Sequence, residues 1–102
     1  MLESLDIATF AGRVGEAFLL APNDATVILT RLIAVTPAPG GSAGGVRAGS
    51  RTPFSLVFRS PPGAPLPQRI YRLQHEELGA LDLFLVPIGP DEAGMCYEAV
   101  FT

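Results

Sequence analysis

The single histidine of the chain stands beside two glutamates, as His75-Glu76-Glu77. Imidazole and carboxylate groups bind divalent metals and transfer protons, so this cluster is the first candidate for chemistry. Successive side chains of an extended segment point to opposite faces, and the three groups therefore do not converge by themselves. The sequence also lacks the second histidine that a His-pair metal motif requires. We expect a turn histidine between strands, and neither a metal site nor a catalytic one.

The single cysteine, Cys96, excludes an internal disulfide and a multi-cysteine zinc site. A nucleophilic thiol needs a lowered pKa and a nearby base, for which only His75 is available. Glu98 has the same strand parity as Cys96, and a carboxylate there raises the pKa of a thiol. The turn acids Asp91 and Glu92 lack the further oxygen ligands that calcium needs. The residues thus predict a protein that is not an enzyme, with no catalytic residue, metal or cofactor.

All seven cationic side chains are arginines, and several stand near aromatic residues, as in barrels that bind single-stranded nucleic acid. The net charge of −3 and the pI near 4.9 oppose such binding. Moreover, Phe54, Phe58 and Tyr71 fall on the core side of their predicted strands. We therefore expect no nucleic-acid partner.

Charge is segregated along the chain. Residues 1–30 carry four acids and one arginine, residues 31–72 carry six arginines and no acid, and residues 73–102 carry six acids and no base. Two explanations compete. The middle and last thirds pair across neighbouring strands and neutralise each other, or the domain is electrically two-sided and docks onto a partner or onto its own copies.

The elements needed to position these residues are one helix and six strands. Asp6 is the expected N-cap of a short helix with Ile7, Phe10 and Val14 on one face, ended by a left-handed cap at Gly15. Beyond it the apolar period changes to two. The strands are predicted at 16–20, 26–36, 54–60, 69–74, 80–86 and 95–102.

In the second of these strands Arg31 interrupts a row of apolar odd positions that includes Leu29. Either a bulge or a paired inward arginine explains the interruption. Shared parity on successive strands predicts a buried core. Its members are Phe18, Leu29, Phe54, Leu56, Phe58, Tyr71, Leu73, Leu83, Tyr97 and Phe101.

Short alternating strands with Gly/Pro turns predict an all-β fold with one short N-terminal helix, a small six-stranded antiparallel barrel or sandwich with the helix plugging one end. Residues 1–102 are expected to form a single domain. Residues 38–51, rich in glycine and proline, are expected to form a flexible loop within it.

Some outward positions of the sheet are also apolar, where a solvated face would be polar. Either the short helix covers them or another chain does. The candidate interface consists of Phe84, Val86, Val57, Arg59 and Arg72.

The longest apolar run, residues 83–88, is far shorter than the roughly 20 residues that span a bilayer. Acids stand near the N-terminus where a signal peptide has positive charge. We expect no membrane partner and a cytoplasmic location, with the place of final assembly left open.

A series of segments extends through nearly the whole chain. It consists of 5–15, 53–59, 66–68, Tyr71-Arg72-Leu73, His75, Leu78-Gly79, 83–87 and 97–101. This order resembles a bacterial family of small proteins catalogued as a domain of unknown function, often encoded beside phage-tail-collar-like proteins of the microcystin-dependent type. The resemblance implies such fibre proteins as partners, and it implies no activity and no catalytic residues. The loop 38–51 is longer and richer in glycine than is typical of the family.

The predicted function is that of a non-enzymatic structural, assembly or adapter protein associated with phage-tail-like fibre proteins, or one that self-associates. The alternative is a small β-barrel binding module whose mouth or sheet edge holds a peptide or a small ligand.

Overall fold

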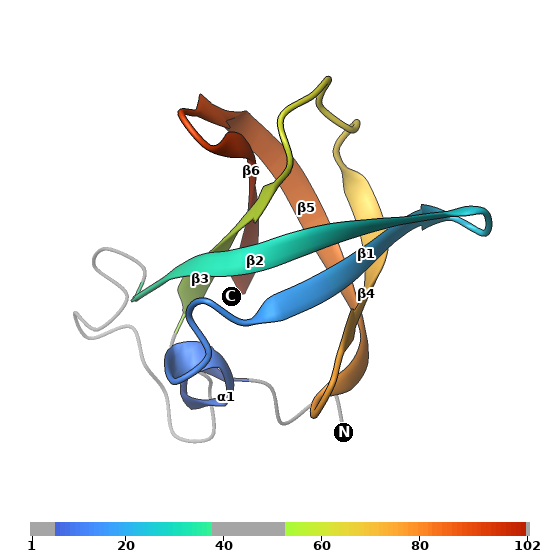
Figure 1. The fold of residues 1–102 in the computed structure, drawn as a ribbon. Coiled ribbons are helices and arrows are strands. Elements are labelled where there is room, and N and C mark those ends of the chain that lie inside the picture. Colours follow the sequence, from blue (N-terminus) through green and yellow to red (C-terminus); the bar gives the residue numbers. More distant parts are fainter. Residues whose placement is uncertain (1–5, 38–52, 102) are drawn as a thin grey trace.

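Six antiparallel strands close into a barrel with a short helix at one end (Figure 1). The computed structural model describes residues 6–37 and 53–101. The order of strands around the barrel is β1-β2-β3-β6-β5-β4. The elements are α1 (Ile7–Ala11), β1 (Ala17–Asn23), β2 (Thr26–Pro37), β3 (Phe54–Ser60), β4 (Arg69–His75), β5 (Gly79–Asp91) and β6 (Gly94–Phe101). The predicted fold class is confirmed, in its barrel form. The predicted loop 38–51 lies outside the described residues.

Along each strand, about every second side chain points into the barrel and helps to fill its interior. In β3, for example, Phe54, Leu56 and Phe58 are fully buried while the residues between them are half-buried. Most of the predicted core is confirmed as buried, namely Phe18, Phe54, Leu56, Phe58, Tyr71, Leu73, Leu83 and Tyr97. Phe101 is only half-buried, and it packs against the edge of the core.

The prediction that Leu29 lies in the core is wrong, because its side chain is 45% exposed. The reason is a bulge in β2 between Leu32 and Ala34, where the register against β3 shifts. Before the bulge the even positions Thr30 and Leu32 point inward, and after it the odd position Val35 packs on the core. A bulge adds one residue to a strand and thereby exchanges its faces.

One inward position of β2, next to the exposed Leu29, is occupied by the polar residue Thr30. The hydroxyl of Thr30 donates to the carbonyl of Phe18 at 2.7 Å and is therefore satisfied although fully buried. Of the two explanations for Arg31, the structure supports a bulge, placed at Ile33 rather than at the arginine, and Arg31 itself is exposed.

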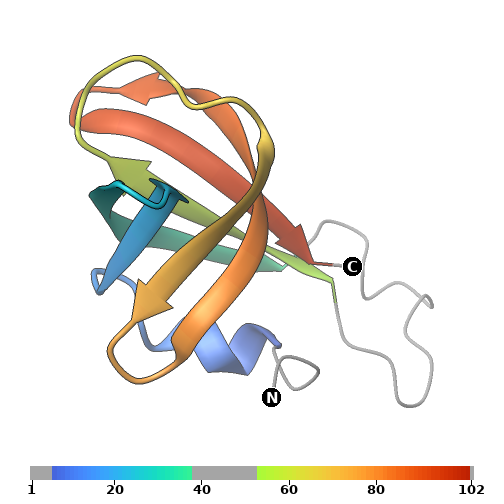
Figure 2. The ribbon, with the colours of Figure 1, turned by 90° about the vertical axis from the view of Figure 1, so that its right-hand side faces the viewer.

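The helix α1 closes one end of the barrel (Figure 2). Asp6 caps it in a reciprocal pair of hydrogen bonds with Thr9. Phe10 is fully buried, with its ring 6.1 Å from that of Phe54 and 5.8 Å from that of Phe101. The helix ends at Gly12, earlier than the predicted cap at Gly15.

The expectation that this helix covers the apolar outer face of β5 is wrong. Its buried residue points into the barrel end, and Phe84 on the outer face stays 50% exposed. Val14, predicted on the same helical face as Phe10, lies beyond the helix and is 52% exposed.

At the other end the proline-rich loop 61–68 is tied to the barrel by two tyrosines. The Tyr71 hydroxyl donates to the carbonyl of Pro67 at 2.5 Å, and the N–H of Leu66 donates to the Tyr97 hydroxyl at 2.9 Å. Both rings are buried, so each tyrosine fills the core while its polar tip is satisfied at the rim.

Strand β5 continues beyond the predicted stop at Pro87, to Asp91. A bulge between Pro87 and Gly89 accommodates the proline in the ladder to β6. The following turn brings β6 very close to β3, because a Cβ built on Gly94 would lie 1.9 Å from the carbonyl oxygen of Ser60. Only glycine fits there.

Replacing Leu83 by alanine should lower the free energy of unfolding by about 2–5 kcal/mol, because the side chain is 5% exposed and its removal leaves a cavity. The matched control Leu29→Ala removes the same atoms from a side chain that is 45% exposed, and it should cost less than about 1 kcal/mol. Urea unfolding measures both. Equal losses would contradict the assigned faces.

Replacing Gly94 by alanine should destabilise the protein by about 1–3 kcal/mol or more, since the new methyl group meets the backbone of Ser60. Gly12→Ala is the control, because nothing lies within 4 Å of the corresponding Cβ, and its effect should stay within about 1 kcal/mol. Thermal unfolding in which the two variants behave alike would count against the close approach of β6 to β3.

Candidate functional site

The outer face of β4, β5 and β6 carries a contiguous row of apolar side chains. Ile70 of β4 lies directly opposite Phe84 of β5, and the two are 65% and 50% exposed. The register of β5 against β6 pairs Val86 with Glu98, and Val100, which is 60% exposed, lies two residues further along β6. We name Ile70, Phe84, Val86 and Val100 the β4–β6 strip.

Three of the predicted interface residues meet on this face. Val86 of β5 and Val57 of β3 both lie opposite Glu98 of β6, one on each side of it. Both valines are half-buried, whereas Phe84 is exposed. Ile70 was not predicted as an interface residue. Its signal was present, because its neighbour Tyr71 faces inward and alternation therefore turns Ile70 outward.

The two predicted interface arginines are held by acids. Arg72 forms a two-pronged ion pair with Asp82 directly across the β4–β5 ladder, at 2.9 and 3.0 Å. Arg59 reaches across β6 to Asp91, with its closest contact at 2.5 Å. These pairs join the arginine-rich middle third to the acidic last third, as the cross-strand explanation of the charge pattern predicts. Two further arginines of the middle third, Arg47 and Arg51, lie outside the described residues.

The thiol of Cys96 is covered by the second of these ion pairs. Cys96 faces outward opposite Arg59 and is nevertheless only 6% exposed. Burial, and then the carboxylate of Asp91, raise the pKa of the Cys96 thiol. The carboxylate that raises the pKa of the thiol is therefore that of Asp91, and not that of Glu98 as expected. A thiol held in its neutral form is a poor nucleophile.

Asp91 also organises the turn between β5 and β6. Its carboxylate accepts hydrogen bonds from the backbone N–H groups of Ala93 and Gly94 at 2.9 and 3.0 Å. The Arg59 guanidinium, followed by the Ala93 N–H, holds the pKa of Asp91 far below its ordinary value. The ionised carboxylate therefore contributes to the stability of the folded state.

His75 is the buried last residue of β4 rather than a turn residue. Its Nδ1 accepts from the backbone N–H groups of Glu77 and Leu78, both at 3.0 Å. The ring proton is therefore on Nε2, which donates to Glu16 Oε1 at 2.7 Å. The bond from His75, and then that from Arg13, hold the pKa of Glu16 below its ordinary value.

This histidine cluster ties together two segments far apart in the sequence, residues 13–18 and residues 75–78. Arg13, between α1 and β1, contacts both Glu16 at 3.3 Å and Glu77 at 2.5 Å. The Phe18 ring lies 4.5 Å from the imidazole of His75. The acidic neighbours Glu76 and Glu77 do not converge on the imidazole, as expected, but Glu16 was missed because it lies 59 residues away.

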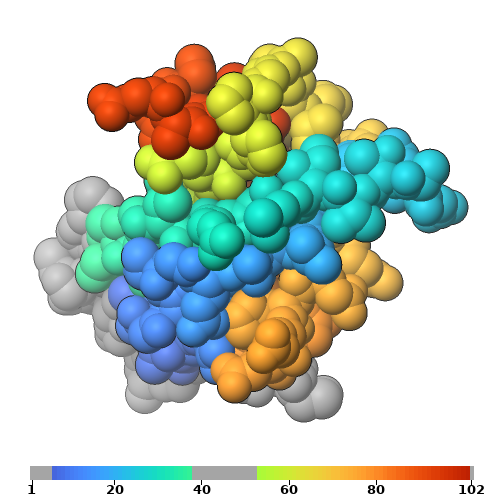
Figure 3. All heavy atoms as spheres, viewed as in Figure 1, coloured from blue at the N-terminus to red at the C-terminus, as the bar shows by residue number. Residues whose placement is uncertain are grey.

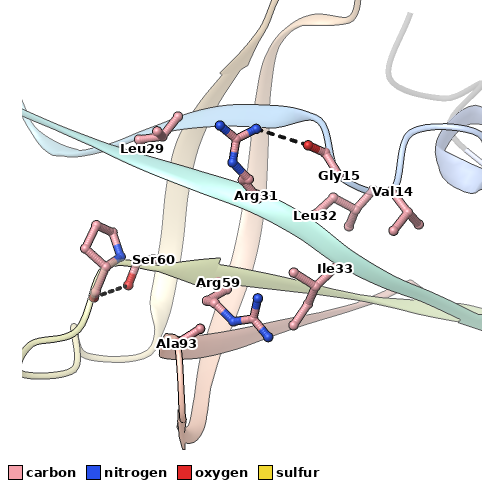
Figure 4. A pocket seen from close by; sticks show the side chains of 10 residues that line it. Val14, Gly15, Leu29, Arg31, Leu32, Ile33, Arg59, Ser60 and Ala93 are labelled. Carbon is pink, nitrogen blue, oxygen red and sulfur yellow. Dashed lines mark hydrogen bonds between the residues drawn. The ribbon is translucent and has the colours of Figure 1, made fainter.

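A groove of about 560 Å³ lies on the outer face where β3 ends beside β2 (Figure 4). Two arginines stand opposite each other in it, Arg31 of β2 and Arg59 of β3. Arg59 is neutralised by Asp91, whereas Arg31 donates from Nη1 to the carbonyl of Gly15 at 3.1 Å, its one hydrogen bond to a described residue. Among the described residues no carboxylate pairs with Arg31. Sequence reasoning missed this groove because the bulge that turns Arg31 outward was not located.

Within residues 6–37 and 53–101, no group of three or more His, Cys, Asp and Glu side chains is arranged to hold a metal ion. In the same ranges the one helix is too short to cross a membrane.

The chain matches a family model described as Domain of unknown function (DUF6916) over residues 5–101. The match covers nearly the whole chain, so the protein belongs to this family, whose function is unknown. Comparison with curated proteins and with solved structures finds no match.

Replacing Asp91 by asparagine should destabilise the protein at pH 7. It should also make the free energy of unfolding less dependent on pH in the acid range. The lowered pKa of Asp91 means that its contribution is complete above the ordinary carboxyl pKa and is lost as pH falls below it. The difference in unfolding free energy between wild type and Asp91→Asn should therefore shrink from pH 7 toward pH 2, measured by urea unfolding.

The control is Glu92→Gln, at the next turn position, whose side chain makes none of the hydrogen bonds in the described part of the chain. Its free energy of unfolding at pH 7 should stay within about 0.5 kcal/mol of the wild-type value. A constant gap for Asp91→Asn would show that the ion pair with Arg59 contributes nothing to stability.

Proposed function

We propose that this protein is a non-enzymatic assembly or adapter module that docks a protein partner on the β4–β6 strip. The observation that supports this most is the pairing of Phe84 with Ile70, two large apolar side chains that are half or more exposed on neighbouring strands. A solvated sheet face is normally polar, and contiguous exposed apolar residues are typical of binding sites. Phe84 is the anchor, since aromatic residues dominate interface energetics.

The composition of the strip's surroundings fits a protein partner. The Arg72–Asp82 pair lies one row from Phe84, and Glu98 lies between Val86 and Val57. An apolar centre beside charged groups is the usual anatomy of a protein interface.

The partner class we propose is a fibre protein of the phage-tail-collar-like, microcystin-dependent type. Support comes from the sequence resemblance, whose family members are often encoded beside such proteins. The proposal places the barrel in the cytoplasm, where the single thiol of Cys96 stays reduced. A second copy of this chain is the competing occupant of the same strip.

A second candidate function is that of a binding module for a peptide or small ligand. The groove beside Arg31 favours it, because it combines a cation that lacks a described carboxylate partner with apolar walls from Val14, Leu29 and Ile33. The two functions use different faces of one barrel.

Replacing Phe84 by aspartate should weaken binding of the partner about tenfold or more, because it places a charge at the centre of the apolar contact. The measurement is titration of the purified barrel with a phage-tail-collar-like protein encoded in the same genome. Sedimentation of each protein alone, at low and high salt, determines whether the barrel self-associates instead.

The control is Leu19→Asp, a matched change at an outward position of β1 that is 43% exposed and lies outside the strip. It should leave binding unchanged. If Phe84→Asp binds the fibre protein as well as wild type does, or if wild type does not bind it, this proposal fails. A wild-type oligomer that Phe84→Asp dissociates assigns the strip to a second copy.

A further inference from the structure

The first part of β2 has no strand on its β3 side among the described residues. The ladder between β2 and β3 begins at Arg31 and Arg59, and β3 ends one residue later at Ser60. The first five residues of β2, 26–30, therefore have strand partners only on β1 among the described residues. This part of β2 belongs to the β1–β2 hairpin, which projects beyond the rest of the barrel (Figures 1 and 3).

The hydrogen-bonding groups of this edge point away from the barrel's own ladder. The N–H of Leu32 donates to the carbonyl of Glu16, and its carbonyl accepts from the N–H of Gly15, so both groups point to the β1 side. Peptide groups alternate in direction along a strand. Those of Val27 and Leu29 therefore point to the opposite side, where β3 has ended. An unpaired row of this kind is a template for an added strand.

The side chains on the same edge are apolar where a protected edge is usually charged. Val27 is 65% exposed and Leu29 is 45% exposed, both on the outer face. Natural edge strands are commonly blunted by lysine, proline or inward charges. None of these three devices is present at positions 26–30, whose sequence is Thr-Val-Ile-Leu-Thr.

A cation stands where an added strand would end. The edge stops at Arg31, whose guanidinium is turned toward Gly15 and away from Arg59 (Figure 4). Within residues 6–37 and 53–101, the bond to Gly15 uses one N–H donor of the guanidinium and leaves four others for a partner. Arg59 on the neighbouring strand is already taken by Asp91, so the positive charge that remains unneutralised in the groove is that of Arg31.

We propose that this edge binds an extended peptide segment of another protein by strand addition, with a carboxylate of that segment paired to Arg31. Backbone hydrogen bonds to Val27 and Leu29 provide affinity, and their side chains contact apolar residues of the segment. The carboxylate stands at the end of the segment that meets Ser60, where the groove opens between β2 and β3. This site is separate from the β4–β6 strip, and it rests on the second candidate function, the peptide-binding module, whose groove beside Arg31 it shares.

Charge favours an acidic partner over a second copy of the same edge. A second β2 edge would offer Val27, Leu29 and Arg31, and its strand positions carry no acid. Strand pairing of two such edges would therefore leave Arg31 without a carboxylate from the strand positions of the other copy.

The experiment uses two soluble, end-capped peptides that alternate valine and threonine. One carries aspartate at each end and the other carries asparagine at each end. The aspartate peptide should bind the full-length protein and shift the backbone amide signals of Val27, Leu29 and Arg31 in ¹H–¹⁵N spectra. Peptides with a single terminal aspartate then reveal the direction of the added strand. The asparagine peptide should bind about fivefold more weakly.

Three variants locate the site. Arg31→Gln should weaken binding of the aspartate peptide about fivefold and leave binding of the asparagine peptide unchanged. Arg69→Gln is the matched control, since Arg69 is also exposed and also bonded to a backbone carbonyl, that of Pro22, and it should have no effect. Leu29→Pro removes the outward N–H while sparing the ladder to β1, and it should abolish binding.

Several results would overturn the proposal. These are no binding at about 1 mM peptide, equal binding of both peptides, an Arg31→Gln variant that binds normally, or amide shifts confined to β5 and β6. A wild-type dimer that Leu29→Pro separates would assign the edge to a second copy. Phe84→Asp should bind the aspartate peptide normally, so failure at the β4–β6 strip and failure at this edge are distinguishable.

Discussion

Closure of the barrel depends on its shortest seam, between β1 and β4. Only three residue pairs join these strands, against seven between β4 and β5. An open seam would expose two unpaired edges. The histidine cluster holds it at one end, because His75 at the end of β4 donates to Glu16 at the start of β1. Two backbone N–H groups orient the imidazole for this bond. The residue that most resembles a catalytic one therefore serves closure.

The bulge in β2 determines what the outside of the barrel presents. It lets Thr30 and Leu32 face inward in the first part of the strand and Val35 in the last. The apolar odd positions before it, including Leu29, are thereby left on the surface beside Arg31. A strand without the bulge would bury one of these sets at the expense of the other. The exposed apolar edge is thus a consequence of how β2 fits into the core at both of its ends.

Local patterns in the sequence predicted the elements well and the long-range contacts poorly. The alternation in 54–60 gave the burial of β3, and Asp6 marked the start of the helix. The interruption at Arg31 suggested a bulge but not its position at Ile33, because both faces of β2 are largely apolar. The partners Glu16 and His75 are 59 residues apart, so no spacing rule connects them. The outward position of Phe84 followed from parity alone, whereas its exposure required knowing where the helix lies.

The two surfaces proposed for binding lie on opposite sides of the barrel. In a closed ring ordered β1-β2-β3-β6-β5-β4, strands β2 and β5 stand three places apart, which is the largest separation that six strands allow. The edge at Leu29 belongs to β2, and the strip around Phe84 is centred on β5. A partner on one side therefore leaves the other accessible. Two independent surfaces on a barrel whose side chains fill its interior are what an adapter requires, since each can be occupied without rearranging the core that separates them.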